Sequence, residues 1–164
     1  MSIENTGERL LVDDSTSNSP LFLRHKIAYV YSENFIKDKI ILDDGCGSGY
    51  GSWHLISSGA RKVIGIDLSK EAIEFAANRY QLKNLIFQQM DVTQLAFDGN
   101  TFDILTSFQV IEHIKDVEKY LSEIKRVLKS GGVLYIDFEP NRRIRSIQKW
   151  LLCMAQTSSI KKIP

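Results

Sequence analysis

The feature that most constrains the fold is a run of glycines directly after a short apolar segment. Residues 40–42 are Ile-Ile-Leu, Asp43 and Asp44 follow, and glycine then occupies every second position from 45 to 51. A short apolar run that stops at glycines is typical of a buried strand in a parallel sheet. The sequence therefore predicts a strand that ends near residue 44, a glycine-rich turn, and a helix over residues 52–58.

Strand and helix patterns alternate through the next ninety residues. We expect strands over residues 62–67, 85–90, 102–108 and 133–138, and helices over residues 70–80 and after Asp116. The last helix carries one apolar stripe that includes Leu128, and we expect it to end at the glycine pair 131–132. This order predicts the α/β class: a doubly wound, mostly parallel sheet of about five strands with flanking helices.

The length of 164 residues predicts one domain, in which terminal segments flank a central core. Residues 1–20 are polar and predict a flexible arm, and residues 38–141 hold the alternating core. Residues 21–36 predict an N-terminal helix, whose buried positions should include Phe22, Ile27, Val30, Tyr31 and Phe35. Residues 142–164 predict a basic helix and tail. A basic amphipathic helix over 142–153 can contact a membrane surface, but we favour a crossover helix packed on the sheet.

Composition excludes several classes of protein. Residues 1–140 carry 15 basic and 20 acidic side chains, so we expect no nucleic-acid partner. The two cysteines, Cys46 and Cys153, cannot form a disulfide framework or a four-ligand zinc site, and we expect no metal. The first residues lack the pattern of a secretory signal, and no apolar run reaches the length of a membrane span. We therefore expect a cytoplasmic location.

Candidate ligand-binding residues follow the predicted strands. In an open α/β sheet, ligands bind outside the carboxyl ends of the strands, near the switch point of strand order. An acid about 20 residues beyond the glycine turn, here Asp67, suits ribose hydroxyls, and Asp91 suits an exocyclic amine such as that of adenine. The glycine turn matches neither the G-x-G-x-x-G dinucleotide motif, because Tyr50 replaces the third glycine, nor the P-loop, because no lysine follows.

Together these segments resemble the class I S-adenosylmethionine-dependent methyltransferases, which have a Rossmann-like fold, in their methyltransferase type 11-like form. The resemblance covers residues 38–141 and rests on ILDDGCGSG (41–49), VIGIDLS (63–69), MDV (90–92), FDILTSFQVIEHI (102–114) and VLKSGGVLYI (127–136). TGERL near the start and EPNRR after residue 138 resemble a bacterial branch that methylates surface polysaccharides or other small molecules. The resemblance implies S-adenosylmethionine as cofactor and a small-molecule or glycan acceptor.

The resemblance also implies a role for each matched residue. Asp43 would hold the methionine ammonium and order the loop, Asp67 would bind the ribose, and Asp91 would meet the adenine amine. The other implied cofactor contacts are the loop residues Gly45, Cys46, Gly47 and Gly49, Leu68 against adenine, the Val92 backbone amide, and Ser107 and Phe108 at the methionine end.

A hydroxyl acceptor would benefit from a general base. His113 is our first candidate and Glu112 the second; the alternative is that this pair only begins the next helix or orders the loop. His25 is a weaker candidate on the N-terminal helix. We interpret His54 as a helix surface residue, and Cys46 as a small packing residue rather than a nucleophile.

Two features depart from the family pattern. Asp44 stands where the family usually has an apolar residue, and only 26 residues follow Phe138, so we expect the last two strands of the family sheet to be lacking. A shortened sheet would leave an exposed edge, which makes a homodimer plausible. The alternatives to a methyltransferase are a non-catalytic S-adenosylmethionine-binding module, or part of a split enzyme, and, less favoured, a nicotinamide-dependent oxidoreductase.

Overall fold

The computed structural model describes residues 20–137 and 159–162. Helix α1 (Pro20–Ser32) and the 3-10 turn η1 (Glu33–Phe35) lead into the sheet. The following elements are β1 (Ile40–Asp44), α2 (Tyr50–Ser57), β2 (Lys62–Asp67), α3 (Lys70–Arg79), β3 (Leu85–Gln89), β4 (Phe102–Phe108), η2 (Ile111–His113), α4 (Val117–Val127), β5 (Leu128–Asp137) and β6 (Ser159–Lys162). The predicted order of helices and strands is confirmed.

The strands form one parallel sheet in the order β3-β2-β1-β4-β5-β6. Strand β1 is central, since it pairs with β2 on one side and with β4 on the other. The chain runs outward from β1 to β3 and then returns to place β4 beside β1. The switch point of strand order therefore lies between β1 and β4, next to the glycine-rich turn, as a doubly wound α/β fold requires.

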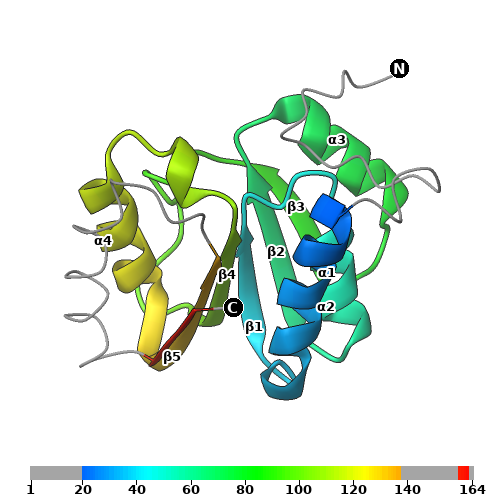
Figure 1. The fold of residues 1–164 in the computed structure, drawn as a ribbon, viewed down its shortest axis with the longest axis horizontal. Coiled ribbons are helices and arrows are strands. Elements are labelled where there is room, and N and C mark those ends of the chain that lie inside the picture. Colours follow the sequence, from blue (N-terminus) through cyan, green and yellow to red (C-terminus); the bar gives the residue numbers. More distant parts are fainter. Residues whose placement is uncertain (1–19, 138–158, 163–164) are drawn as a thin grey trace.

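Two cores lie on opposite faces of the sheet. Helices α1 and α2 cover one face and α4 covers the other (Figure 1). Along β1, Ile41 packs in the core that contains Tyr29 and Leu55, whereas the next residue, Leu42, packs in the core that contains Tyr120. Successive side chains of a strand point to opposite faces, so Asp43 and Asp44 at the end of β1 also face opposite cores.

Helix α4 ends earlier than its sequence predicts. Asp116 caps its start, because its Oδ1 accepts a bond from the Lys119 amide at 3.0 Å, as expected. The helix then stops at Val127, and Leu128 already belongs to β5, where it pairs with Phe102. The expected glycine cap is wrong: residues 131–132 lie inside β5, where the pairing with β4 shifts register.

The predicted buried face of the N-terminal helix is also wrong. Ala28 and Tyr29 are buried, whereas Ile27 is 62% exposed. The exposed large apolar side chains of this segment are Leu23, Ile27, Val30 and Tyr31 of α1 and Phe35 of η1. The helix has this rotation because the Tyr29 ring packs edge-on against Phe108, with centroids 4.8 Å apart, and its hydroxyl reaches β1. The side chain of Phe22 lies outside the described residues.

The five predicted strands are confirmed, and the sheet has a sixth that the sequence did not predict. Strand β6 runs parallel to β5, with Val133 opposite Ser159 and Ile136 opposite Lys162. The predicted arm over 1–19 and the predicted basic helix over 142–153 lie outside the described residues. Within the part of the chain that the structure describes, no helix has the length and apolar character needed to cross a bilayer.

Candidate cofactor and active site

The glycine-rich loop lies at the carboxyl end of β1, at the switch point. Gly45, Gly47 and Gly49 have φ angles of +70°, +51° and +80°, a region that favours glycine. The loop is fixed by two backbone hydrogen bonds, from the Cys46 amide to the Ile66 carbonyl and from the Gly49 amide to the Cys46 carbonyl, each 2.9 Å long. The alternating glycines thus build one defined turn.

The four glycines differ in what their α-carbons face. A Cβ at Gly45 would collide with Val110, one at Gly49 with Ala76 and Phe87, and one at Gly51 with the Tyr29 ring. A Cβ at Gly47 would meet no atom within 4 Å. Three of the glycines therefore allow close packing, and Gly47 is the one that presents bare backbone to open space.

Asp67 is held beside that open backbone. Its Oδ2 accepts a hydrogen bond from the Gly47 amide at 3.0 Å, and its Oδ1 accepts one from the Ser69 amide at 2.8 Å. The next residue, Leu68, is 68% exposed, the largest exposed fraction among the large apolar side chains that the structure describes. A fixed carboxylate beside an exposed apolar side chain suits a ligand with hydroxyls and a flat ring, as predicted for ribose and adenine.

Asp91 lies on an exposed turn after β3. Its Oδ1 accepts hydrogen bonds from both the amide and the hydroxyl of Thr93, each 2.8 Å long. These bonds hold the pKa of the Asp91 carboxyl below its usual value, so the group is ionised at neutral pH. The side chain of Val92 is buried in the core below α4, which leaves its backbone as the part able to meet a ligand.

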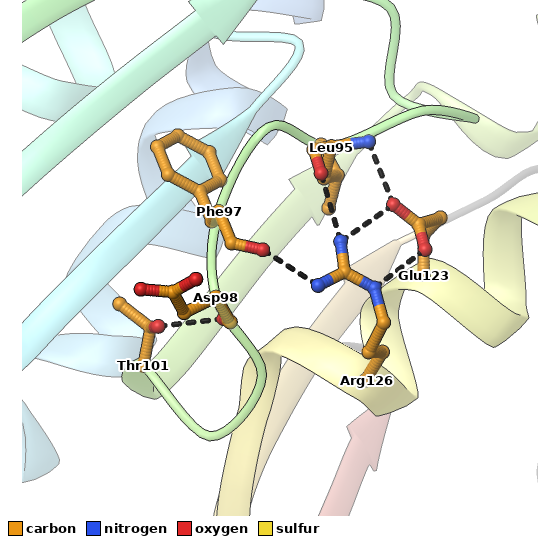
Figure 2. Close-up of polar contacts among 6 residues, drawn as sticks. All are labelled: Leu95, Phe97, Asp98, Thr101, Glu123 and Arg126. Atoms are coloured by element: carbon orange, nitrogen blue, oxygen red, sulfur yellow. Dashed lines mark hydrogen bonds and ion pairs between the residues drawn. The ribbon is translucent and has the colours of Figure 1, made fainter.

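An arginine and a glutamate of α4 clamp the loop that follows Asp91 (Figure 2). The Arg126 guanidinium donates to the carbonyls of Leu95 and Phe97, at 2.8 and 2.6 Å, and to the Glu123 carboxylate. The Glu123 Oε2 accepts in turn from the Leu95 amide at 2.7 Å. The position of this loop relative to the sheet therefore depends on α4.

Asp43 is fully satisfied by the protein. It is 1% exposed, and three hydroxyls donate to it: Tyr29 at 3.1 Å and Thr106 at 2.7 Å to Oδ1, and Ser52 at 2.6 Å to Oδ2. Burial raises the pKa of the carboxyl, and the three hydroxyl bonds oppose that rise. These bonds tie β1 to α1, α2 and β4, which supports the predicted ordering role; its predicted contact with a methionine ammonium stays a prediction.

Asp44 faces the other core. Its Oδ2 accepts a hydrogen bond from the Tyr120 hydroxyl at 2.5 Å, and that hydroxyl shares a second bond, 2.6 Å long, with Ser107. The pKa of Asp44 is raised to about 7: burial is the largest cause, the charges of Asp43 and Asp67 add to it, and the hydroxyls of Tyr120 and Ser107 oppose it. A second carboxyl group thus lies directly below the glycine-rich loop.

Three other predicted cofactor contacts are buried. Ser107 is completely buried and bonds to Tyr120, and Phe108 packs on Tyr29 at the opposite face. Cys46 is buried within the loop, and burial raises the pKa of its thiol well above the usual value, which supports a packing role. The predicted contacts of Ser107 and Phe108 with a methionine group stay predictions.

The candidate bases lie on η2, beyond the carboxyl end of β4. His113 is exposed, and Glu112 is partly buried and acts electrostatically on Tyr120. His54 is not a free surface residue: its Nε2 lies 2.6 Å from Glu33 Oε1, and its ring stacks on Tyr50. The side chain of His25 lies outside the described residues.

Sequence reasoning missed four hydroxyl-bearing partners of the two aspartates: Tyr29, Ser52, Thr106 and Tyr120. The signal for two of them is present in the sequence. Thr106 interrupts the apolar strand 102–108, and Tyr120 places a hydroxyl within an otherwise apolar stripe. Buried polar groups need partners, so such residues indicate a polar group on a neighbouring element.

A model of the methyltransferase domain matches residues 42–136, more than half of the chain. The chain belongs to the methyltransferase domain family. This match spans β1 to β5 and so includes the loop, Asp67, Asp91 and η2. The chain is therefore a class I S-adenosylmethionine-dependent methyltransferase domain by fold and family.

Individual relatives agree with this assignment. The methyltransferase domain is 34% identical over 137 residues to a protein of Mycobacterium tuberculosis named as a probable S-adenosylmethionine-dependent methyltransferase, covering 84% of this chain and 48% of the relative. It is 33% identical over 112 residues to a ubiquinone biosynthesis O-methyltransferase of Coxiella burnetii, covering 67% and 47%. The chain thus spans about half the length of these relatives.

A solved structure shows the same fold. The YcgJ protein of Bacillus subtilis superposes with a TM-score of 0.65 at 26% identity, covering 82% of this chain and 63% of that one. The cofactor of the methyltransferase family is S-adenosylmethionine, and the site fits it. Open backbone at Gly47, the tethered Asp67 carboxylate and the exposed Leu68 offer a cradle, a ribose acceptor and an apolar surface side by side.

Proposed function

We propose that this chain carries the cofactor-binding and catalytic core of an S-adenosylmethionine-dependent methyltransferase that acts on a hydroxyl of a small molecule or glycan. The observation that carries the proposal is Gly47, whose amide bonds to Asp67 and whose α-carbon faces open space. Bare backbone and a fixed acid at a switch point suit a nucleoside cofactor without phosphates. The O-methyltransferase relative supports oxygen as the methylated atom.

When bound, S-adenosylmethionine supplies a methyl group made electrophilic by a sulfonium. The chain's own residues then have to hold and align the reactants, which is catalysis by proximity and orientation. Asp67 would hold the ribose, Leu68 and Asp91 the adenine, and the loop around Gly47 the methionine part. His113, exposed on η2, would take the proton from the acceptor hydroxyl, with Glu112 as the second candidate.

Calorimetric titration with S-adenosylhomocysteine, with NAD as control, tests the cofactor. Gly47→Ala should weaken binding at least tenfold, because its Cβ would enter the space that the ligand needs. Gly131→Ala is the matched control, since Gly131 also has a positive φ, +75°, and also faces open space, but lies inside β5. Equal affinity of both variants would contradict the assigned cradle, and preference for NAD would contradict the cofactor.

Transfer of a labelled methyl group from S-adenosylmethionine into small-molecule and glycan fractions of a bacterial extract tests the activity. We expect His113→Asn to lower the transfer rate at least tenfold while binding of S-adenosylhomocysteine is kept. Binding without any transfer by the unaltered chain would favour a non-catalytic module or part of a split enzyme. A homodimer and membrane contact through residues 142–153 stay predictions.

A further inference from the structure

Asp44 is a buried carboxyl group that the proposed mechanism does not use. It is 3% exposed, Tyr120 donates to its Oδ2, and its Oδ1 is buried without a hydrogen-bond partner among the described residues. A buried carboxylate oxygen without a donor is costly when the group is ionised. Since the carboxyl end of β1 leads directly into the loop, this unsatisfied group lies next to the cofactor cradle.

The groups around Asp44 come from every element that meets at this point. Asp43 lies on β1, Asp67 on β2 and Tyr120 on α4. The thiol of Cys46 lies in the glycine-rich loop. Ser107 of β4 bonds to Tyr120, and Glu112 of η2 acts on Tyr120. The charged neighbours that act most strongly on Asp44, Asp43 and Asp67, are both acidic.

Asp67 also belongs to the proposed cofactor site, because its carboxylate accepts a hydrogen bond from the Gly47 amide. The charge of Asp67 changes the pKa of Asp44, so a charge on a ligand bound in this site should change that pKa too. Coupling of this kind is reciprocal, so the ionisation of Asp44 changes the affinity for a charged ligand by the same factor as the ligand changes the ionisation. The sulfonium of S-adenosylmethionine is a cation, and the thioether of S-adenosylhomocysteine is neutral.

We propose that Asp44 makes the cofactor site selective for charge, so that the site favours the cationic S-adenosylmethionine over its neutral product. This inference rests on the proposed function. In the transfer, the acceptor oxygen bonds to the methyl carbon, the sulfur–carbon bond breaks and its electron pair stays on sulfur, and the acceptor proton passes to the base. The sulfur loses its positive charge, and with it the attraction to Asp44.

The direction of the pH effect follows from this attraction. A bound cation favours the ionised carboxylate and lowers the pKa of Asp44 from its value of about 7. Affinity for S-adenosylmethionine therefore rises with pH, whereas affinity for S-adenosylhomocysteine changes little. If the cation lowers this pKa by about one unit, the ratio of the two affinities increases about fivefold between roughly pH 6 and 8.5.

The test is calorimetric titration of the whole chain with each ligand at both pH values. The unaltered chain should show the fivefold increase in the affinity ratio, and Asp44→Asn, which stays neutral, should show a constant ratio. Asp38→Asn is the control: Asp38 is exposed at the amino end of β1 and has a φ of +61° that asparagine tolerates. This variant should keep the pH dependence. A second variant, Tyr120→Phe, should shift the increase to higher pH.

The outcomes separate this inference from the proposed function. If both ligands bind and the ratio is independent of pH in the unaltered chain, charge selection by Asp44 is wrong and the cofactor assignment stands. If the ratio changes equally in Asp44→Asn and in the unaltered chain, another group is responsible and the inference is wrong. If the folded chain binds neither ligand at either pH, the proposed function itself fails.

Discussion

Asp43 and Asp44 are neighbours in sequence, nearly equal in burial, and opposite in environment. Asp43 faces the α1 and α2 side, where three hydroxyls occupy its two oxygens. Asp44 faces the α4 side, where Tyr120 donates to one oxygen and the other has no partner among the described residues. The two carboxyl groups are almost equally buried but have different numbers of hydrogen-bond donors. We infer that the number of donors, rather than burial alone, determines whether such a group stabilises the fold or is available to respond to a ligand.

Removing the satisfied carboxylate should have the largest effect. Asp43→Ala leaves the buried hydroxyls of Tyr29 and Ser52 without their acceptor, and leaves that of Thr106 with only a 3.4 Å bond to the Leu42 carbonyl. We expect a loss of roughly 3–5 kcal/mol in the free energy of unfolding. Urea denaturation measures it. Asp98→Ala, at an exposed position, is the control. A loss no larger than that of the control would show that Asp43 does not hold β1 to α1, α2 and β4.

Neutralising the other carboxyl group should stabilise the chain. The pKa of Asp44 is about 7 in the folded chain and about 3.9 when unfolded, so the folded state binds more protons between these values. Stability therefore falls as pH rises from about 4 to 7 and then levels off. Asp44→Asn escapes this fall, and its advantage should grow by roughly 2–3 kcal/mol between roughly pH 5 and 7.

Urea denaturation of Asp44→Asn and the unaltered chain across this pH range measures the difference. The pKa of Asp43 is also raised, but Asp43 is present in both proteins, so its contribution largely cancels in the comparison. A constant difference between pH 5 and 8 would mean that Asp44 ionises at its ordinary pKa despite its burial. The contrast between the two aspartates would then be lost.

Removing the tyrosine hydroxyl that donates to Asp44 tests the same comparison through the partner of the carboxyl group. Tyr120→Phe takes away the hydroxyl that serves both Asp44 and Ser107, and we expect a loss of about 1–2 kcal/mol at pH 8. The Tyr120 bond lowers the pKa of Asp44, so the pH at which stability levels off should also move upward. Tyr31→Phe, at an exposed ring, is the control. An unchanged pH profile would contradict the coupling.

The smallest effect is expected away from both aspartates. Arg126→Met removes the clamp on Leu95 and Phe97, but the guanidinium is partly exposed, so we expect a loss of about 1 kcal/mol or less. Hydrogen exchange of the amides between residues 93 and 99 should nevertheless accelerate. Lys125→Met, at the adjacent exposed position, should leave exchange unchanged. Equal exchange in both variants would show that the loop does not depend on Arg126.

The sequence predicted the order and type of the elements well, because periodicity and glycine turns are local signals. Strands β2 and β4 have the expected bounds. The end of α4 was wrong because Leu128 continues the helical stripe in sequence, yet its pairing with Phe102 on β4 takes precedence. The rotation of α1 was wrong for a similar reason, since the contact of Tyr29 with Phe108 is distant in sequence.

The sequence predicted which residues belong to the candidate site, but it did not predict how their side chains pack and bond to one another. The loop, Asp67 and Leu68 could be placed because strand ends converge at the switch point. The division of the glycines into three packing positions and one open position depends on Val110, Ala76, Phe87 and Tyr29, which no local pattern connects to the loop. The environments of Asp43 and Asp44 depend in the same way on hydroxyls from other elements.

The central position of β1 also affects the chain while the ribosome is still making it. Thr106 follows Asp43 by 63 residues, and Tyr120 follows Asp44 by 76. At roughly 5–20 residues per second, translation needs roughly 3–15 seconds to supply these donors after the aspartates are made. Until then Asp43 has only Tyr29 and Ser52 as donors and Asp44 lacks Tyr120, so water has to solvate the remaining carboxylate oxygen positions. A translational pause between β2 and β4 would extend the time during which the partly formed sheet lacks these donors.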